Sequence, residues 1–303
     1  MRASQTSKVK PLRPISALLL AALLGIPASL EAERLTSQTE EAFARYVRAT
    51  ETRINQELAG RGRFLSIDSL PRPSRDQAYA DLRNGQIAIQ QTQRSDLAAA
   101  ISVPRGLIHD WTGIVFIPGV SMAQVISVLQ DYEHASQYYG PQVVKSRLLE
   151  HSGNDFRVFL RLKQIQIVTV VLDSEYSVHY AFLDSVRAFS RSYSTRIAEV
   201  ENAGEAQERE LPVGDDNGFL WRLYSYWRFY QSEDGAFVQC NAISLTRNVP
   251  AGLGWLIRPF LETIPGDSLR FTLEATRNEV VKRVQSSFPP ESSFTGEKAH
   301  ELK

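Results

Sequence analysis

The spacing of hydrophobic and polar residues along this chain changes period twice, which predicts helices on both sides of a region rich in strands. Apolar residues recur at helical intervals from Thr36 to Leu58 with charged residues between them, so we expect an amphipathic helix there. From about Asn84 apolar and polar residues alternate, as they do in a half-buried strand. A helical period returns near the end and predicts a helix from about Ser268 to Ser286, with its buried stripe formed by Leu269, Leu273, Thr276, Val280 and Val284.

Turn-forming residues divide the middle of the chain into eight predicted strands. One helix follows the second of them, starting at the capping residue Ser121 and ending near Tyr139, before Gly140-Pro141. Short turns between consecutive strands produce antiparallel pairing, so the order predicts an α+β fold with one wide, curved sheet. We expect the middle and final helices to cover the same face of it. The predicted strands are residues 86–91, 106–118, 143–150, 156–162, 165–180, 187–199, 219–230 and 237–246.

Residues 219–245 have the clearest pattern and predict a hairpin that turns at residues 232–235. This turn pairs Phe229 with Val238, Trp227 with Cys240 and Ser225 with Ala242. Large residues then lie opposite small ones, which leaves space for a helix or a ligand against a concave sheet. One face of the first strand carries Phe219, Trp221, Leu223, Trp227 and Phe229, and the other carries Arg222, Tyr224, Tyr226, Arg228 and Tyr230.

Four runs in this half of the chain carry a family resemblance. They are Tyr226-Trp-Arg-Phe-Tyr, then Asp234-Gly-Ala-Phe-Val-Gln-Cys-Asn-Ala-Ile-Ser-Leu-Thr-Arg, then Pro250-Ala-Gly-Leu-Gly-Trp-Leu-Ile-Arg-Pro-Phe, and Ile264-Pro-Gly-Asp-Ser-Leu-Arg-Phe-Thr-Leu. The chain resembles the START-like superfamily (SRPBCC, helix-grip), which includes polyketide cyclase/dehydrase-like proteins. The resemblance is close over residues 226–277 and extends by element order alone back to about Asn84.

The resemblance implies a helix-grip fold, in which a strongly bent antiparallel sheet holds a long C-terminal helix and often encloses an apolar ligand cavity. It implies binding of a lipid or another hydrophobic small molecule, and it brings no shared set of catalytic residues. Fold-level likeness alone is weak support for a function. The domains expected on this basis are residues 33–83, an N-terminal amphipathic helix and linker, and residues 84–288, the START-like domain.

The expected cavity wall consists of Trp221, Leu223, Trp227, Phe229, Val238, Cys240, Leu269 and Leu273. The alternative for the aromatic residues of this set is an ordinary packed core. Two residues of the other strand face, Tyr226 and Arg228, would orient the polar end of a ligand if the two faces were inverted. Otherwise the arginine is expected to reach solvent, with its stem covering tyrosines. Cys240 is the single cysteine, so no intrachain disulfide can form, and we interpret it as a buried structural residue.

The N-terminus has the pattern of a secretory signal peptide. Residues 1–14 carry four basic residues and no acidic one, an apolar run follows from Ile15 to Ile26, and small residues lead to Ala32. We therefore expect residues 1–32 to be a signal peptide that is cleaved near Ala32, and the protein to be periplasmic or secreted. An uncleaved membrane anchor is the alternative. No later run approaches the length of a membrane span, and residues 289–303 are expected to be a disordered polar tail.

Charge and motifs restrict the chemistry further. Lys plus Arg and Asp plus Glu number 34 each, which argues against nucleic-acid binding. The five histidines show no metal-ligand spacing, and no phosphate-binding loop or nucleophile elbow is present, so we assign no catalytic residue, metal or cofactor. The sequence predicts an exported binding or carrier module for a hydrophobic small molecule or lipid. The alternatives are a cyclase or dehydratase-type enzyme acting on a polyketide-like substrate, and a non-catalytic structural or interaction domain with a filled core.

Overall fold

The computed structural model describes residues 34–60, 62–92, 101–165, 169–248 and 254–287. The expected signal peptide, its cleavage site and the C-terminal tail lie outside the described residues. Within them, no helix combines the length and the apolar character that crossing a bilayer requires.

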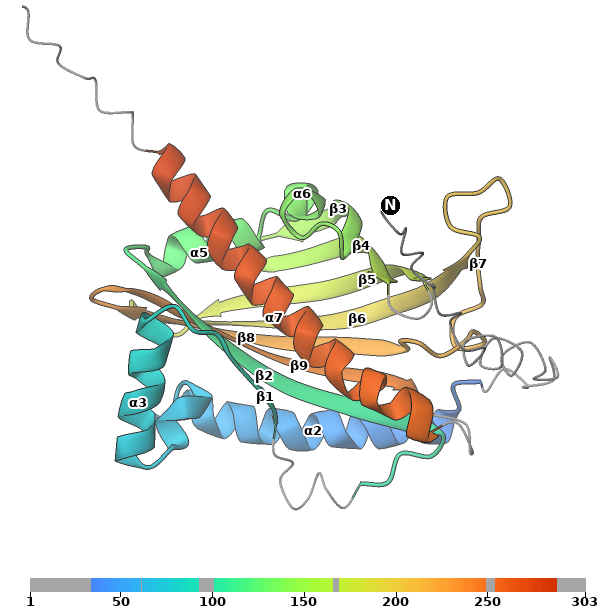
Figure 1. The fold of residues 1–303 in the computed structure, drawn as a ribbon, viewed down its shortest axis with the longest axis horizontal. Coiled ribbons are helices and arrows are strands. Elements are labelled where there is room, and N and C mark those ends of the chain that lie inside the picture. Colours follow the sequence, from blue (N-terminus) through green and yellow to red (C-terminus); the bar gives the residue numbers. More distant parts are fainter. Residues whose placement is uncertain (1–33, 61, 93–100, 166–168, 249–253, 288–303) are drawn as a thin grey trace, which may run out of the picture.

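One antiparallel sheet organises the described residues, with strand order β1-β2-β9-β8-β6-β5-β4-β3 and with β7 paired to β6 alone. The sheet is twisted and curved (Figure 1). Its strands are β1 (Ala88–Gln91), β2 (Gly106–Pro118), β3 (Val143–Ser152), β4 (Asp155–Ile165), β5 (Thr169–Phe182), β6 (Arg187–Glu201), β7 (Arg209–Glu210), β8 (Arg222–Ser232) and β9 (Gly235–Arg247).

The final helix crosses one face of this sheet diagonally (Figure 1). The shorter middle helices pack beside it on the same side, as predicted. The helices are α2 (Ser37–Ala59), α3 (Arg72–Arg83), α5 (Met122–Leu129), α6 (Ala135–Tyr138) and α7 (Gly254–Ser286), with short 3-10 turns η1 (Ser66–Ser69) and η2 (Tyr132–His134). A curved antiparallel sheet holding a long C-terminal helix is a helix grip, so the predicted fold class is confirmed.

The face under α7 is called the α7 side below. The predicted stripe of α7 is buried there, because Leu269, Leu273 and Val280 pack against β2, β8 and β9. The helix begins at Gly254, well before the predicted start near Ser268. The sequence Pro265-Gly266 is typical of a helix end. Here tertiary packing favours continuation, since a Cβ atom at residue 266 would lie 2.9 Å from the Trp111 ring and glycine lets the helix approach β2 closely.

Helix α2 covers the opposite face, called the α2 side below. Its apolar stripe packs against β2, β6, β8 and β9, and η1 and α3 continue this layer beside it. The predicted amphipathic helix is therefore present, and it forms a second packed layer on the same sheet. The α2 stripe consists of Phe43, Tyr46, Val47 and Ile54, and it meets Ile108, Phe189, Trp221, Tyr226, Ile243 and Leu245.

Candidate functional site

Small side chains line the middle of the sheet on the α7 side. The β8–β9 hairpin has the predicted register, with Ser225 opposite Ala242 and Trp227 opposite Cys240. Continued across the neighbouring strands, this register forms two rows of residues. The first row is Val178, Ser192, Ser225, Ala242 and Trp111, and the second is Tyr180, Ser190, Trp227, Cys240 and Gly113.

Side chains at the centre of these rows keep part of their surface accessible to solvent. The set Trp111, Ser192, Leu223, Ser225, Trp227 and Ala242, called the central trough below, is half-buried although it lies in the middle of the sheet. On the α2 side of the same strands, Tyr226, Phe237 and Ile243 are fully buried. Since close-packed interiors leave few voids larger than a water molecule, this accessible surface indicates space above the trough, and Tyr193 and Tyr224 are half-buried in the same way on the α2 side.

Buried polar atoms also lie on the α7 side of these strands. Among the described residues, Trp111 Nε1, Tyr176 Oη and Ser190 Oγ are buried without a well-formed hydrogen bond, and Tyr176 and Ser190 interact with the hydroxyls of Ser174 and Tyr180, respectively. Burial raises the pKa of Tyr176 to about 12, so its hydroxyl stays protonated at neutral pH. Burial also raises the pKa of Tyr180 to about 12, and its Oη lies 2.9 Å from Tyr132 Oη. This wall can therefore donate and accept hydrogen bonds while carrying no charge.

Most of the predicted wall residues lie on the α7 side. Leu223 and Trp227 belong to the trough, and the remaining five pack in the core beside it: Phe229, Val238, Cys240, Leu269 and Leu273. Burial raises the pKa of the Cys240 thiol, which keeps it protonated and suits the structural interpretation of this residue.

The prediction that Trp221 lines the cavity is wrong, because this residue lies on the α2 side. It packs in the core of the α2 side, and its Nε1 donates to Asp216 Oδ1 at 2.9 Å. Strand β8 begins only at Arg222, so the alternation from which the face was inferred does not reach Trp221. The indole N–H needs a partner when buried, and the carboxylate of Asp216 supplies one.

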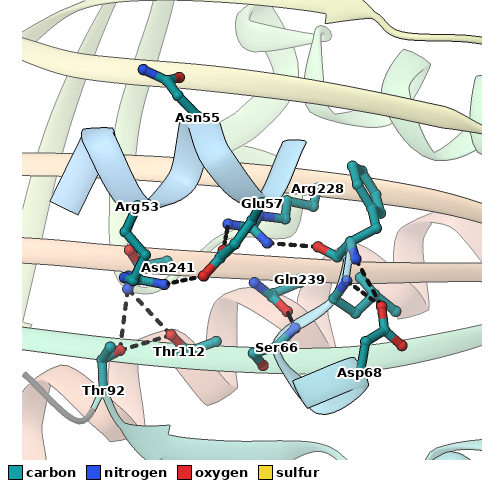
Figure 2. Close-up of polar contacts among 12 residues, drawn as sticks. Arg53, Asn55, Glu57, Ser66, Asp68, Thr92, Thr112, Arg228, Gln239 and Asn241 are labelled. Carbon is teal, nitrogen blue, oxygen red and sulfur yellow. Dashed lines mark hydrogen bonds and ion pairs between the residues drawn. The ribbon is translucent and has the colours of Figure 1, made fainter. Parts of the chain in front are cut away.

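Tyr226 and Arg228 were predicted to orient a ligand, with Arg228 otherwise reaching solvent, and the structure places neither residue in such a setting. Both point to the α2 side and are buried. Tyr226 Oη donates to Glu51 Oε1 at 3.0 Å. Arg228 donates to the carbonyl oxygen of Phe64 at 2.6 Å and forms an ion pair with Glu57 (Figure 2). Both residues attach the α2 layer to the sheet.

A network of polar side chains lies under α2, and the sequence patterns did not predict it. Asn241 Nδ2 donates to Asp110 Oδ1 at 2.7 Å, and Tyr46 Oη donates to Asp110 Oδ2 at 2.7 Å. Beside them, Gln239 Oε1 accepts from the backbone N–H of Ser66 at 2.7 Å (Figure 2). The available signal was a polar residue at every second position of β9 within an apolar run, at Gln239 and Asn241. Because each contact joins two elements of the fold, we interpret the network as structural.

Open grooves on the surface of the described residues include the following two. The larger, of about 360 Å³, runs between α3, the end of β2 and the second half of α7. Three cations line it, and each already has a partner: Arg83 pairs with Asp234, Lys282 pairs with Glu279, and Arg277 donates to the carbonyl oxygen of Gly85. The smaller groove, of about 330 Å³, lies between α2 and β8. Among the described residues, no group of three His, Cys, Asp or Glu side chains could hold a metal ion.

Comparison with known proteins finds similarity in structure alone. No protein-family model matches the chain, and no curated protein matches its sequence. A STAR-related lipid transfer protein from Xanthomonas axonopodis is 16% identical, with 64% of this chain and 98% of that chain covered and a TM-score of 0.43. The Zhui aromatase/cyclase from Streptomyces sp. R1128 is 14% identical, with coverages of 60% and 98% and a TM-score of 0.40.

Human STARD10 is also similar, with 9% identity, 73% of this chain and 87% of that chain covered, and a TM-score of 0.40. The printed names of the Xanthomonas protein and of STARD10 are START-related, while the helix-grip fold of this chain rests on its own sheet and final helix.

Proposed function

We propose that this chain is an exported binding or carrier module for a hydrophobic small molecule or lipid, held between α7 and the sheet. The observation that carries the proposal is the accessible surface of the central trough in the middle of the sheet. Apolar and small side chains surround it, which suits a ligand that is mostly hydrocarbon. Export rests on the signal-peptide pattern of residues 1–32.

The free energy that a ligand could gain by burial in the trough suits this role. Burial of about 300 Å² of apolar ligand surface would contribute on the order of 7 kcal/mol, taking ~25 cal/mol per Å². Taken alone, this gain corresponds to a dissociation constant of about 10 μM, and the cost of immobilising the ligand makes the net affinity weaker than that. A carrier needs such an affinity, because it must release its ligand as well as bind it.

A fluorescence assay with a variant that fills the trough tests the proposal. The neutral probe N-phenyl-1-naphthylamine is titrated into the protein, and we expect its emission to rise on binding. Ser192→Trp places a large ring in the trough and should weaken probe binding at least tenfold. Ser177→Trp is the matched control, since Ser177 is exposed on the neighbouring strand β5. Equal affinity in the two variants, or no binding by the unmodified protein, would reject the proposal.

Mass spectrometry under native conditions adds an independent test. Protein purified from the periplasm or medium of the organism that makes it should carry an apolar compound, detected as a mass increment and identified after solvent extraction. The same preparation reports whether residues 1–32 have been removed. Protein that retains these residues, or that is found only in the cytoplasm, would contradict the export part of the proposal.

A further inference from the structure

One flank of α2 is attached to the sheet near both of its ends. At helical spacing along the helix, this flank carries Glu40, Ala44, Arg48, Glu51 and Asn55. Glu40 pairs with Arg222 of β8 at one end. At the other end, Glu51 accepts from Tyr193 Oη of β6 at 2.5 Å, and Asn55 accepts from Arg191 of the same strand. Ala44 and Arg48 lie between these attachments, where the groove of about 330 Å³ opens between α2 and β8.

Aromatic rings line this groove. Phe43 of α2 and Tyr224 of β8 belong to its lining, and their rings meet edge to face with centroids 5.2 Å apart. Tyr193 extends the row of rings onto β6, since its centroid lies 4.9 Å from that of Tyr224. The third apolar contribution, from Ala44, is a single methyl group, which leaves room beside the rings. A flat aromatic ligand suits such a wall, because aromatic pairs gain attraction beyond the area they bury.

The groove also contains an unpaired positive charge. Its lining includes two arginines, Arg48 and Arg222, and one acidic residue, Glu40. Glu40 pairs with Arg222, which also donates to the carbonyl oxygen of Trp221 at 2.7 Å. Arg48 is exposed, and its guanidinium has no ion pair or hydrogen bond within the part of the chain that the structure describes. The hydroxyl of Tyr224 likewise makes no hydrogen bond to a described residue.

We infer that this groove is a second ligand site, separate from the trough, and that it binds a small aromatic carboxylate. The ring packs against Phe43 and Tyr224, and the carboxylate gains a countercharge from Arg48 and a hydrogen bond from the Tyr224 hydroxyl. The volume is near the lower end of the roughly 300–1,000 Å³ of small-molecule sites, so the ligand has one or two rings. The sheet separates the two sites, because Tyr224 and its neighbour Ser225 point to opposite faces.

Calorimetric titration with matched ligands tests the inference. The full chain is titrated at neutral pH and low ionic strength with 2-naphthoate, with its uncharged analogue 2-naphthamide and with the non-aromatic cyclohexanecarboxylate. We expect 2-naphthoate to bind with a dissociation constant below about 1 mM, and the other two to bind at least about fivefold more weakly. Added salt should weaken 2-naphthoate and leave 2-naphthamide unchanged, since it screens exposed charges.

Replacing the unpaired arginine locates the ligand. Arg48→Gln should weaken 2-naphthoate about five- to tenfold and leave 2-naphthamide unchanged. Arg45→Gln is the matched control, because Arg45 is exposed on the same helix and does not line the groove. Tyr224→Phe keeps the ring, removes the hydroxyl and should weaken 2-naphthoate about three- to fivefold. Both lining variants should unfold at the same temperature as the unmodified chain.

Three results would overturn the inference: no binding of 2-naphthoate at millimolar concentration, equal affinity for 2-naphthoate and 2-naphthamide, or equal effects of Arg48→Gln and Arg45→Gln. Displacement of 2-naphthoate by N-phenyl-1-naphthylamine, or its loss in Ser192→Trp, would place the ligand in the trough and would also overturn it. The proposed function is tested separately. If the neutral probe fails to bind while 2-naphthoate binding depends on Arg48, the proposed function is rejected and the second site stands.

Discussion

Arg228 and Glu57 form an ion pair of 2.5 Å that joins the middle of the sheet to the last turn of α2. The arginine is 3% exposed on β8, and burial lowers its pKa although the carboxylate of Glu57 opposes this shift. Glu57 also accepts from Arg53 at 2.9 Å (Figure 2). The pair is thus the point at which the α2 layer neutralises a cation buried in the sheet.

Removing the carboxylate should therefore destabilise the protein strongly. Glu57→Ala leaves the Arg228 guanidinium buried without a countercharge, and we expect a loss of about 3 kcal/mol in the free energy of unfolding, measured by urea denaturation. Glu40→Ala is the matched control, because it removes the partner of Arg222 at a more exposed site and should cost less than about 1 kcal/mol. Equal losses in the two variants would show that burial of the pair is unimportant.

Helix α2 should be indispensable for folding. Deleting residues 33–62 exposes Tyr226, Ile243 and Leu245, which are fully buried on the α2 side, and leaves Asp110 without the hydroxyl of Tyr46. We expect the shortened chain to lose cooperative thermal unfolding, compared with a chain that starts at residue 33. A remainder that stays folded and monomeric would instead identify α2 as a separable module, as the predicted boundary near residue 83 implies.

The β8–β9 turn depends on a glycine at its end. A Cβ atom at Gly235 would lie 2.3 Å from the carbonyl oxygen of Ile117, a backbone atom that cannot move aside cheaply. We expect Gly235→Ala to cost about 3 kcal/mol in the free energy of unfolding. Gly153→Ala is the control, since Gly153 also has a positive φ but has open space around it, and should cost about 1 kcal/mol. A smaller effect at Gly235 than at Gly153 would contradict this account.

Within the regular strands and helices, periodicity was sufficient to predict which residues share a face, and it failed at Trp221, which precedes the start of β8. The pairing of Trp227 with Cys240 and the buried stripe of α7 follow directly from alternation and from helical spacing. Alternation does not say which face lies under which layer, and for this reason the surroundings of Arg228 were wrong. The clue that both faces are covered is β2, where Ile114, Val115, Phe116 and Ile117 are all apolar and all buried.

The trough itself could be anticipated only in part. Small residues opposite large ones in the hairpin indicated space, but the contribution of β6 depends on the long-range pairing of Ser192 with Ser225. Tyr176 and Trp111 reach the same region from strands far apart in sequence. Local patterns carry no information about such pairings. They also carry none about the polar contacts under α2, which join segments more than a hundred residues apart.

The ion pair between Arg83 and Asp234, which joins α3 to the β8–β9 turn, should make stability depend on pH in the acid range. The hydrogen bond from Arg83 and then that from Ser232 lower the pKa of Asp234 from 3.8 to about 2. The folded state therefore favours the charged carboxylate more than the unfolded chain does. Its contribution is complete above about pH 4 and is lost as the pH falls from there towards 2.

We expect the stability difference between the unmodified protein and Asp234→Asn, measured by urea denaturation from pH 6 to pH 2, to shrink over this interval. Arg83→Met should flatten the same part of the profile, because it removes the main cause of the shift. A difference that stays constant down to pH 2 would mean that the carboxylate titrates alike in the folded and unfolded chains.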